Sequence, residues 1–196
     1  MADQPLVEKV LRGDTNAFKT IIKSTEGLVA QIIFKMISNN EDRKDIAQDV
    51  YLKTFQSLQQ FKFQSKLATW IGHIAYNTCV NYLEKKKLVL LDNTNNEDET
   101  KESPLVILDN RSIDISRNET ENLIFRKEIS EILKTEIDKL APLYKTLITL
   151  YHNEELSYAE IAQITDLPEG TVKNYLFRAR NKLRVNLLLT YKKEEL

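Results

Sequence analysis

The most informative part of the chain is Ser157-Tyr158-Ala159-Glu160-Ile161-Ala162, followed by Leu167-Pro168-Glu169-Gly170-Thr171-Val172-Lys173-Asn174. Ser157 and Glu160 have the spacing of a capping box, in which each side chain can bond the other residue's backbone N–H. Leu167 precedes a proline, which disfavours helical backbone angles at that leucine. Pro168 is itself suited to open a new helix. The pattern predicts a short helix, a tight turn and a second helix.

The second helix has an apolar back and a basic front. Val172, Leu176, Ala179 and Leu183 recur at steps of three and four residues, which predicts a buried stripe. Residues 171–193 contain seven Lys or Arg and no Asp or Glu. Charge alone would fit an ordinary solvated helix. Together with the capped helix and turn before it, the pattern favours a helix that reads the major groove of DNA.

Composition limits the remaining choices. The chain has 196 residues, a net charge of −1 and one cysteine, Cys79, so no internal disulfide can form. A lone cysteine fits a reducing cytoplasm, and we see no signal peptide and no apolar run long enough to cross a membrane. His73 and His152 are too few and too isolated for a convincing metal or nucleophile site. We therefore expect no catalytic residues, no metal and no cofactor.

The chain divides into two apparently helical parts, so the predicted fold class is all-α. Residues 1–87 contain long amphipathic patterns, as do residues 121–196. The part between them, 88–120, is hydrophilic, and from Leu88 to Glu121 nine acidic residues stand against three basic ones. No period persists there, which predicts a flexible acidic linker. We expect two small helical domains joined by this linker, the second containing the helix-turn-helix.

Motifs in both parts, in this order, resemble those of the bacterial RNA polymerase sigma factors of the sigma-70 family. The helix from Asp42 to Phe55 resembles their second-region helix, and the segments Phe61–Ser65, Thr69–Asn77 and Asn81–Leu83 resemble the promoter-melting segment that follows. Leu140-Ala141-Pro142 and the helix-turn-helix resemble their fourth region. With only these two regions present, the layout resembles the extracytoplasmic-function (ECF) subclass.

The resemblance implies a division of labour along the chain. Residues 1–87 would bind core polymerase and the −10 promoter element, and residues 121–196 would bind the −35 element. The polymerase-docking residues implied are Asp45, Gln48, Asp49, Leu52 and Lys53. Asp45 and Asp49 share a helix face. A solvated face is a close competitor for this pair, and the resemblance favours docking.

The resemblance also implies which residues would meet DNA. Melting exposes bases that aromatic and amide groups can hold, and the −10 candidates are Lys62, Phe63, Gln64, Ser65, Lys66, Trp70, His73, Tyr76 and Asn77. Trp70 also fits a core position. In the second helix of the helix-turn-helix, the −35 candidates are Thr171, Lys173, Asn174, Phe177, Arg178 and Arg180. Lysine or arginine can serve guanine, and asparagine can serve adenine.

Several positions depart from the family pattern. Asp166 stands where a turn glycine is usual, although aspartate tolerates left-handed angles better than most residues. Asn174 replaces a frequent serine and Tyr175 a frequent arginine. Tyr76 and Asn81 also differ from the commoner arginine and aspartate. These departures leave the class intact and change the expected promoter sequence.

Two partners follow from the resemblance, core RNA polymerase and promoter DNA, and an anti-sigma factor is a third candidate. Direct membrane insertion is not expected. The alternative function is a helix-turn-helix regulator that acts without polymerase docking. The segments 42–55 and 61–77 discriminate against it, because such a regulator has no need of them.

Ile71 generates a testable prediction. It follows a single Trp70, where housekeeping relatives carry two tryptophans in tandem, so one aromatic wedge is available for melting. We expect stringent promoter requirements, measured as open-complex formation on promoters with increasing numbers of mismatches. Efficient opening of heavily mismatched promoters would contradict this.

Overall fold

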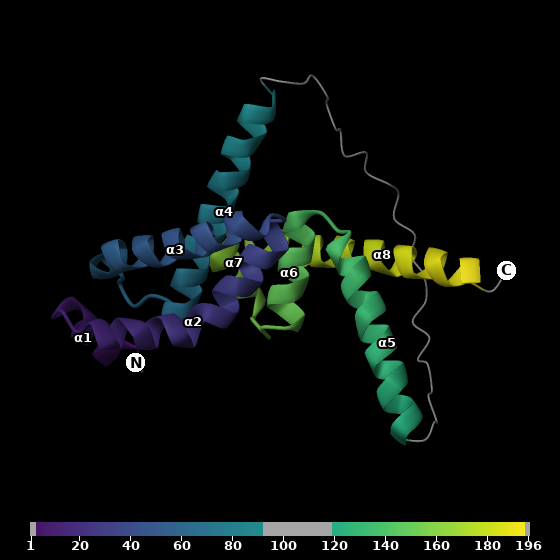
Figure 1. Cartoon of the computed structure of the whole chain (residues 1–196), viewed down its shortest axis with the longest axis horizontal. Coiled ribbons are helices and arrows are strands. Elements are labelled where there is room, and N and C mark those ends of the chain that lie inside the picture. The colour runs from purple at the N-terminus through teal and green to yellow at the C-terminus, as the bar shows by residue number, and fades with distance from the viewer. Residues whose placement is uncertain (1–2, 92–118, 195–196) are drawn as a thin grey trace.

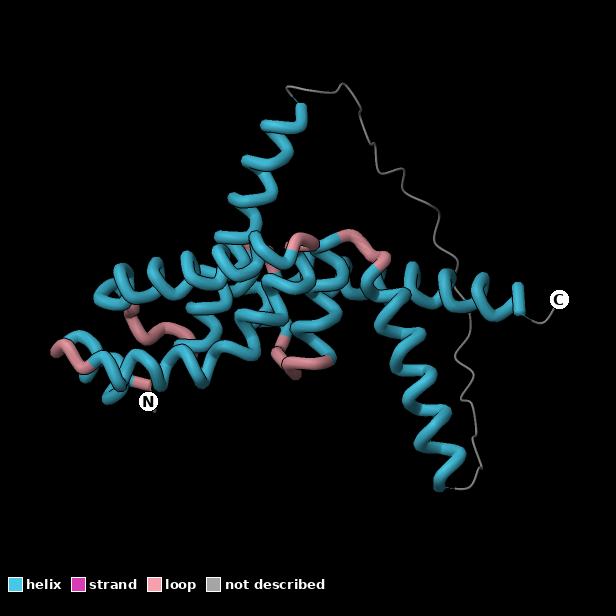
Figure 2. Tube along the Cα trace, viewed as in Figure 1, coloured by secondary structure: helices cyan, strands magenta, loops and turns pink. Residues whose placement is uncertain are grey.

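The structure is a computed structural model that describes residues 3–91 and 119–194. Every regular element within these two ranges is a helix, as Figures 1 and 2 show, which confirms the all-α prediction. The predicted linker lies outside the described residues for most of its length, from 92 to 118.

The N-terminal half contains α1 (Gln4–Leu11), α2 (Thr15–Met36), α3 (Asn40–Ser57), a short 3-10 turn η1 (Leu58–Gln60) and α4 (Leu67–Leu91). Polar side chains mark three of the starts. Asp14 accepts hydrogen bonds from the backbone N–H groups of the first turn of α2, and Asn39 does so for α3. The carboxylate of Asp3, far away in sequence, accepts from Leu67 N at 3.1 Å and so caps α4.

The helix α4 is longer than predicted. It continues to Leu91, four residues beyond Lys87, where we expected the linker to begin. Residues 88–91 are apolar and include no glycine or proline, so no residue that disfavours a helix follows Lys87 directly. The helix α4 therefore continues into the first four residues of the predicted linker.

The C-terminal half contains α5 (Glu119–Asp138), α6 (Pro142–His152), α7 (Tyr158–Thr165) and α8 (Glu169–Glu194). The capping box at the start of α7 is confirmed: Glu160 N donates to Ser157 Oγ at 3.2 Å, and Ser157 N donates to Glu160 Oε2 at 2.9 Å. Asp166 ends α7 in the left-handed conformation with φ 54°. The carbonyl of Pro168 accepts the first bonds of α8, so the turn forms as predicted.

The two halves pack against each other. In Figure 1, α6 and α7 lie beside the N-terminal helices, and the contacts join α2 to α6 and α4 to α7. Ile21, Ile32 and Ile71 belong to one hydrophobic cluster with Leu147, Ile161, Ile164 and Leu176, all fully buried. The sequence patterns predicted each half, but they gave no sign that the halves share a core.

On α3 the predicted apolar side is only partly correct. Ile46 and Val50 are buried, and Thr54 completes their stripe one turn later. The spacing of apolar residues from 42 to 58 predicts one apolar side formed by Ile46, Val50, Leu52, Phe55 and Leu58, but Leu52 and Phe55 have exposed fractions of 55% and 51%. The helical period turns them away from Val50 and Thr54. Phe55 still packs edge-on against Phe18 of α2, with 5.1 Å between the ring centroids.

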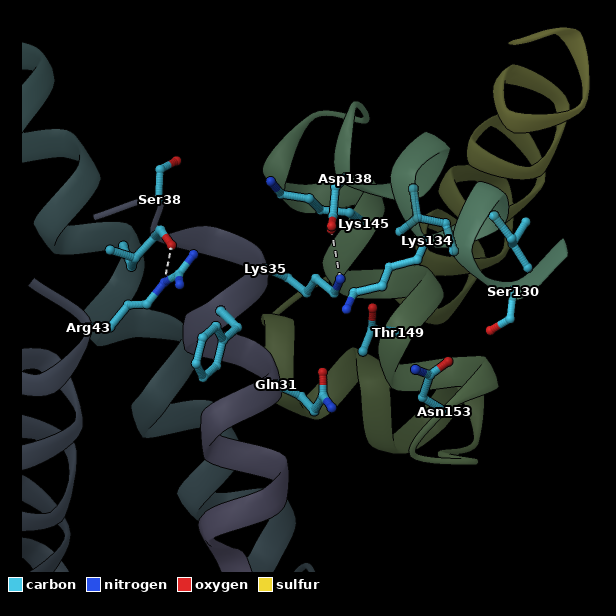
Figure 3. A pocket seen from close by; sticks show the side chains of 14 residues that line it. Gln31, Lys35, Ser38, Arg43, Ser130, Lys134, Asp138, Lys145, Thr149 and Asn153 are labelled. Atoms are coloured by element: carbon cyan, nitrogen blue, oxygen red, sulfur yellow. Dashed lines mark hydrogen bonds and ion pairs between the residues drawn. The ribbon is translucent and has the colours of Figure 1, made fainter. Parts of the chain in front are cut away.

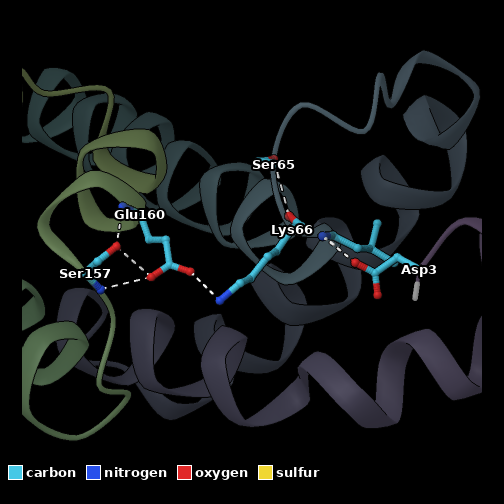
Figure 4. A network of polar contacts seen from close by, with 6 residues as sticks. Asp3, Ser65, Lys66, Ser157 and Glu160 are labelled. Atoms are coloured by element: carbon cyan, nitrogen blue, oxygen red, sulfur yellow. Dashed lines mark hydrogen bonds and ion pairs between the residues drawn. The ribbon is translucent and has the colours of Figure 1, made fainter. Parts of the chain in front are cut away.

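An ion pair joins the halves at the start of α7. Lys66 Nζ lies 2.8 Å from Glu160 Oε1, while the other oxygen of that carboxylate bonds Ser157 (Figure 4). The hydrogen bond from Lys66 is the largest influence on Glu160, and those from Ser157 add to it. Together they lower the pKa of Glu160 to about 2.

This shift predicts an acid dependence of stability. Because the folded pKa of Glu160, about 2, is below its ordinary value, the carboxylate stabilises the fold above pH ~4.5 and loses that effect as pH falls toward its folded pKa. Glu160→Gln should therefore lower the free energy of unfolding at pH 7 and hardly at all near pH 2. Chemical denaturation of both proteins across this range checks it; a difference that does not change with pH would count against it.

Candidate nucleic-acid interface

The helix-turn-helix presents the predicted residues on an open face of α8. Val172, Leu176 and Ala179 are fully buried against α6 and α7, which confirms three residues of the predicted apolar stripe, whereas the fourth, Leu183, is only half-buried. The remaining surface carries exposed side chains that combine positive charge, an amide and an aromatic ring: Lys173, Asn174, Phe177 and Arg178. Phe177 has an exposed fraction of 49%, so its ring is accessible on this face.

Contacts along this face restrain one of its lysines. Lys173 Nζ pairs with Glu169 Oε1 at 2.8 Å, one turn earlier, and lies 5.4 Å from the centroid of the Tyr158 ring. The hydrogen bond that Lys173 donates to Glu169 raises the pKa of Lys173, so the ammonium form is favoured. The side chain is therefore charged and held near the N-terminal turns of α8, the part of a recognition helix that meets base edges.

Arg180 has a different position from the others. Its guanidinium lies 5.0 Å from the centroid of the Tyr151 ring, and its Nε donates to His152 Nε2 at 3.3 Å. Burial, and then the charge of Arg180, lowers the pKa of His152, which suits an imidazole that accepts this bond. Arg180 therefore fastens α8 to α6. The sequence gave no signal that Tyr151 and His152 would contact Arg180. Thr171, another −35 candidate, is only half exposed.

The polar face of α3 is a second open surface. Asp45, Gln48, Asp49, Leu52 and Lys53 are all exposed, and they lie on the part of α3 that is turned away from the core or, like Lys53, at its edge. The structure thus brings together all five residues that the sequence pointed to for docking. Leu52 gives this charged surface an apolar point, and Lys53 Nζ donates to Thr78 Oγ1 of α4 at 3.3 Å.

The loop before α4 is built on aromatic rings that pack against one another at a tilt. Phe61 is buried, and its ring centroid lies 4.8 Å from that of Phe63 and 5.1 Å from that of Trp70. Phe63 has φ 57°, a left-handed angle that costs energy in a residue with a Cβ. Lys62, Gln64 and Lys66 are exposed on this loop, and Ser65 is half-buried. Trp70 is half-buried, so it contributes to the packing and still presents part of its ring.

The remaining −10 candidates face the other half of the protein. His73 Nδ1 lies 3.2 Å from the backbone oxygen of Ile164 in α7, and its Nε2 lies 3.0 Å from Asn77 Nδ2. A carbonyl can only accept, so Nδ1 carries the hydrogen and Nε2 accepts from the amide of Asn77. Tyr76 is half-buried; burial first, then the neighbouring Cys79 and Tyr175, raises its pKa. None of these contacts was predictable from the spacing of residues in α4.

A groove lies where the two halves meet, lined by residues of α2, α5 and α6 and by Arg43 of α3 (Figure 3). Its volume is about 770 Å³, and its lining combines apolar side chains with the basic Lys35, Arg43, Lys134 and Lys145. Lys35 Nζ pairs with Asp138 at 2.8 Å across it, joining α2 to the end of α5. The guanidinium of Arg43 lies 4.4 Å from the centroid of the exposed Phe34 ring.

The described residues offer little for catalysis. Burial raises the pKa of the Cys79 thiol to about 12, so this sulfur is a poor nucleophile. Within residues 3–91 and 119–194 no group of His, Cys, Asp and Glu side chains is arranged to hold a metal ion. None of the helices described is both long and apolar enough to span a membrane.

Comparison with known proteins identifies the family. The family model for sigma-70 region 2 matches residues 21–89, and that for sigma-70 region 4 matches residues 128–183. The chain is 35% identical over 189 residues to an ECF RNA polymerase sigma-E factor of Haemophilus influenzae, covering 93% of this chain and 94% of the relative. It is 33% identical over 185 residues to the protein of that name in Escherichia coli, covering 93% of each.

Solved structures show the same fold. The chain resembles CnrH, solved with the cytosolic domain of CnrY, with a TM-score of 0.63, 19% identity and coverage of 95% of this chain and 97% of that one. It also resembles the sigma factor RpoE of Bartonella quintana, solved with the anti-sigma factor NepR, with a TM-score of 0.61, 20% identity and coverage of 87% and 96%. The helix-turn-helix, the polar face of α3 and these likenesses agree: the chain belongs to the ECF sigma factors of the sigma-70 family.

Proposed function

We propose that this protein binds core RNA polymerase, recognises the −10 and −35 promoter elements and supports promoter melting. The observation that carries the proposal is that one chain presents both the polar face of α3 and the basic face of α8, in segments that match regions 2 and 4 of the family. In this proposal residues 1–87 act as region 2, residues 88–120 as the linker that α4 enters, and residues 121–196 as region 4. The protein acts in the cytoplasm and is not an enzyme.

The face of α3 is the proposed polymerase-docking surface. Its acidic residues Asp45 and Asp49 are exposed, and Leu52 provides an apolar anchor beside them. Such a mixed surface suits a partner that supplies basic groups around an apolar contact, because charge pairing at the rim selects the partner and apolar burial supplies affinity. The regulator that acts without polymerase is not supported, because it leaves this face and the match to region 2 without a role.

The aromatic loop and α4 are the proposed −10 surface. Phe63 and Trp70 offer ring faces on which an unstacked base can stack, and Gln64 and Asn77 offer amides that can read base edges. Lys62 and Lys66 lie where they can meet phosphates. Ile71 is fully buried and is not aromatic. Its half-buried neighbour Trp70 is therefore the side chain at these two positions that can present a ring for melting.

The proposed −35 surface is the exposed face of α8. Lys173, Asn174 and Arg178 are the proposed base-edge readers, with Phe177 packing against the groove. Thr171 is a proposed phosphate contact. Arg180 would act through Tyr151 and His152, which fix α8 against α6, so its role is to position the reading helix.

An anti-sigma factor is a proposed regulator. CnrH and the Bartonella quintana RpoE, whose folds this chain shares, were solved with the cytosolic domain of CnrY and with the anti-sigma factor NepR. A protein partner of this kind would act on region 2 and region 4 together, since the two halves lie in contact in this chain.

The docking proposal predicts a loss of polymerase binding. Asp49→Lys should weaken binding to core polymerase at least about five-fold, a loss of more than ~1 kcal/mol that separates energetically important interface residues from the rest, because it reverses one charge of the α3 face. Affinity measured by titrating labelled protein with core polymerase checks this. Glu131→Lys is the matched control, since it reverses an exposed charge on α5 outside the proposed surface. If Asp49→Lys and Glu131→Lys bind core polymerase with equal affinity, the α3 face is not the docking surface.

The −35 proposal predicts an altered sequence preference. Asn174→Ala should cost the holoenzyme about 1–3 kcal/mol of discrimination at one position of the −35 element, because a bidentate base contact is lost. Run-off transcription from a library randomised in that element, followed by sequencing, measures it. Lys182→Ala is the control on the same helix: it removes an exposed charge outside the proposed base contacts, so it should lower the amount of transcript without changing the preferred bases. An unchanged preference in the Asn174 variant would rule out its base contact.

A further inference from the structure

Tyr158, the first residue of α7, connects two of the proposed −35 residues. Its ring stacks on that of Tyr151 in α6, with 5.0 Å between the centroids and 16° between the planes. Lys173 Nζ lies 5.4 Å from the centroid of the Tyr158 ring, and the guanidinium of Arg180 lies 5.0 Å from that of Tyr151. These side chains therefore form a continuous row, from Arg180 through the two rings to Lys173, that joins α6, α7 and α8.

We propose that Tyr158 is a positioning residue, which holds the ammonium group of Lys173 in place for a guanine of the −35 element. The inference rests on the proposed function of α8 and deepens it, because it says how a flexible side chain can select a base. Tyr158 belongs to the first helix of the helix-turn-helix, whereas the −35 candidates of the sequence pattern all lie in the second.

Lysine needs a restraint of this kind if it is to select a base. Its ammonium is a compact charge on a flexible stem, so an unrestrained lysine on an exposed helix face can follow any nearby phosphate. A phosphate contact carries no sequence information, whereas a contact to guanine O6 and N7 does. Restraint before binding also lowers the entropy that the contact costs. Selection by the exposed Lys173 therefore depends on what holds its ammonium group.

Two groups on different helices hold that ammonium. Glu169 Oε1, one turn earlier in α8, lies 2.8 Å from Lys173 Nζ, and the Tyr158 ring attracts the same charge from α7. An ammonium carries several N–H donors, so the bond to Glu169 leaves others for a base edge. Glu169 moves with α8, but the ring fixes Lys173 relative to the rest of the helix-turn-helix.

The Tyr158 ring can position Lys173 because its own place is fixed. It is stacked on Tyr151, which is held in turn by Arg180 and by the His152 ring, whose centroid lies 4.9 Å away in an edge-on contact. A leucine at position 158 could fill the same space, but it has no π face for the ammonium or for the neighbouring ring. The proposed role therefore requires the ring and is more than packing.

Substitutions at Tyr158 test the proposal in the holoenzyme. Tyr158→Leu should lower discrimination at the −35 position that Lys173 reads about two- to five-fold, the range of an exposed cation–π contact. Tyr158→Phe keeps the ring and should keep the discrimination. Run-off transcription from a library randomised in the −35 element, followed by sequencing, measures each preference as a ratio of bases, which does not depend on how much of a variant is folded. Lys173→Ala identifies the position concerned.

A double-mutant cycle separates positioning from packing. If Tyr158 acts through Lys173, Tyr158→Leu should have no further effect on base preference in a Lys173→Ala background, but should keep its full effect in an Asn174→Ala background. Asn174 is the matched partner because it is the next exposed residue of α8 and projects from the helix about 100° round from Lys173.

Each outcome decides the proposal. A loss confined to the position read by Lys173, restored by Tyr158→Phe, supports it. Equal losses at every −35 position, or equal effects in both backgrounds of the cycle, would make Tyr158 a packing residue and overturn it. A Tyr158→Phe variant as impaired as Tyr158→Leu would assign the role to the hydroxyl and also overturn it.

Failure of the inference is distinguishable from failure of the proposed function. If Lys173→Ala changes no base preference while Asn174→Ala does, the role of Tyr158 is refuted and the proposed −35 recognition by α8 stands. If the unaltered holoenzyme shows no preference anywhere in the −35 element, both are refuted.

Discussion

The apolar contact between α4 and α7 is the constraint on which the arrangement of this molecule depends. Gly72 lets Ile164 approach the backbone of α4, and Ile71 and Ile161 extend the contact within one buried cluster. Burial of such side chains is the dominant favourable term in association. The polar contacts around it, from Lys66 to Glu160 and from His73 to Ile164, set the register in which the halves meet.

These polar contacts suit a reversible interface. Exposed ion pairs contribute little to stability and weaken as salt increases, and Lys66 is largely exposed. A second ion pair, between Lys35 and Asp138, joins the halves at a groove whose lining is mainly basic among its charged residues. The interface therefore combines an apolar centre, which holds the halves together, with charged edges that a polymerase or a nucleic acid can compete for.

Much of each half could be predicted from local patterns. The capping box at Ser157 and Glu160, the turn at Asp166 and the stripe of Val172, Leu176 and Ala179 each depend on residues within a few positions of one another. Helix period and capping act at that range, so sequence alone is informative. The helical period did not predict the exposure of Leu52 and Phe55, because an apolar residue in a helix does not reveal how far another helix covers it. At residues 88–91, the change in sequence character predicted the start of a linker, but α4 continues there.

The sequence by itself determined that the chain is all-α, that it contains a helix-turn-helix and which residues line the open face of α8. It also determined the polar face of α3, since both depend on a repeat of 3.6 residues within one helix. Only the tertiary structure decided that Arg180 is anchored by Tyr151 and His152, and that His73 and Asn77 face α7. The reason is that Arg180 and His152 are 28 positions apart in the chain and His73 and Ile164 are 91 positions apart. Asn77 is linked to α7 only through His73. Such contacts are set by how helices pack in space, and no local pattern encodes them.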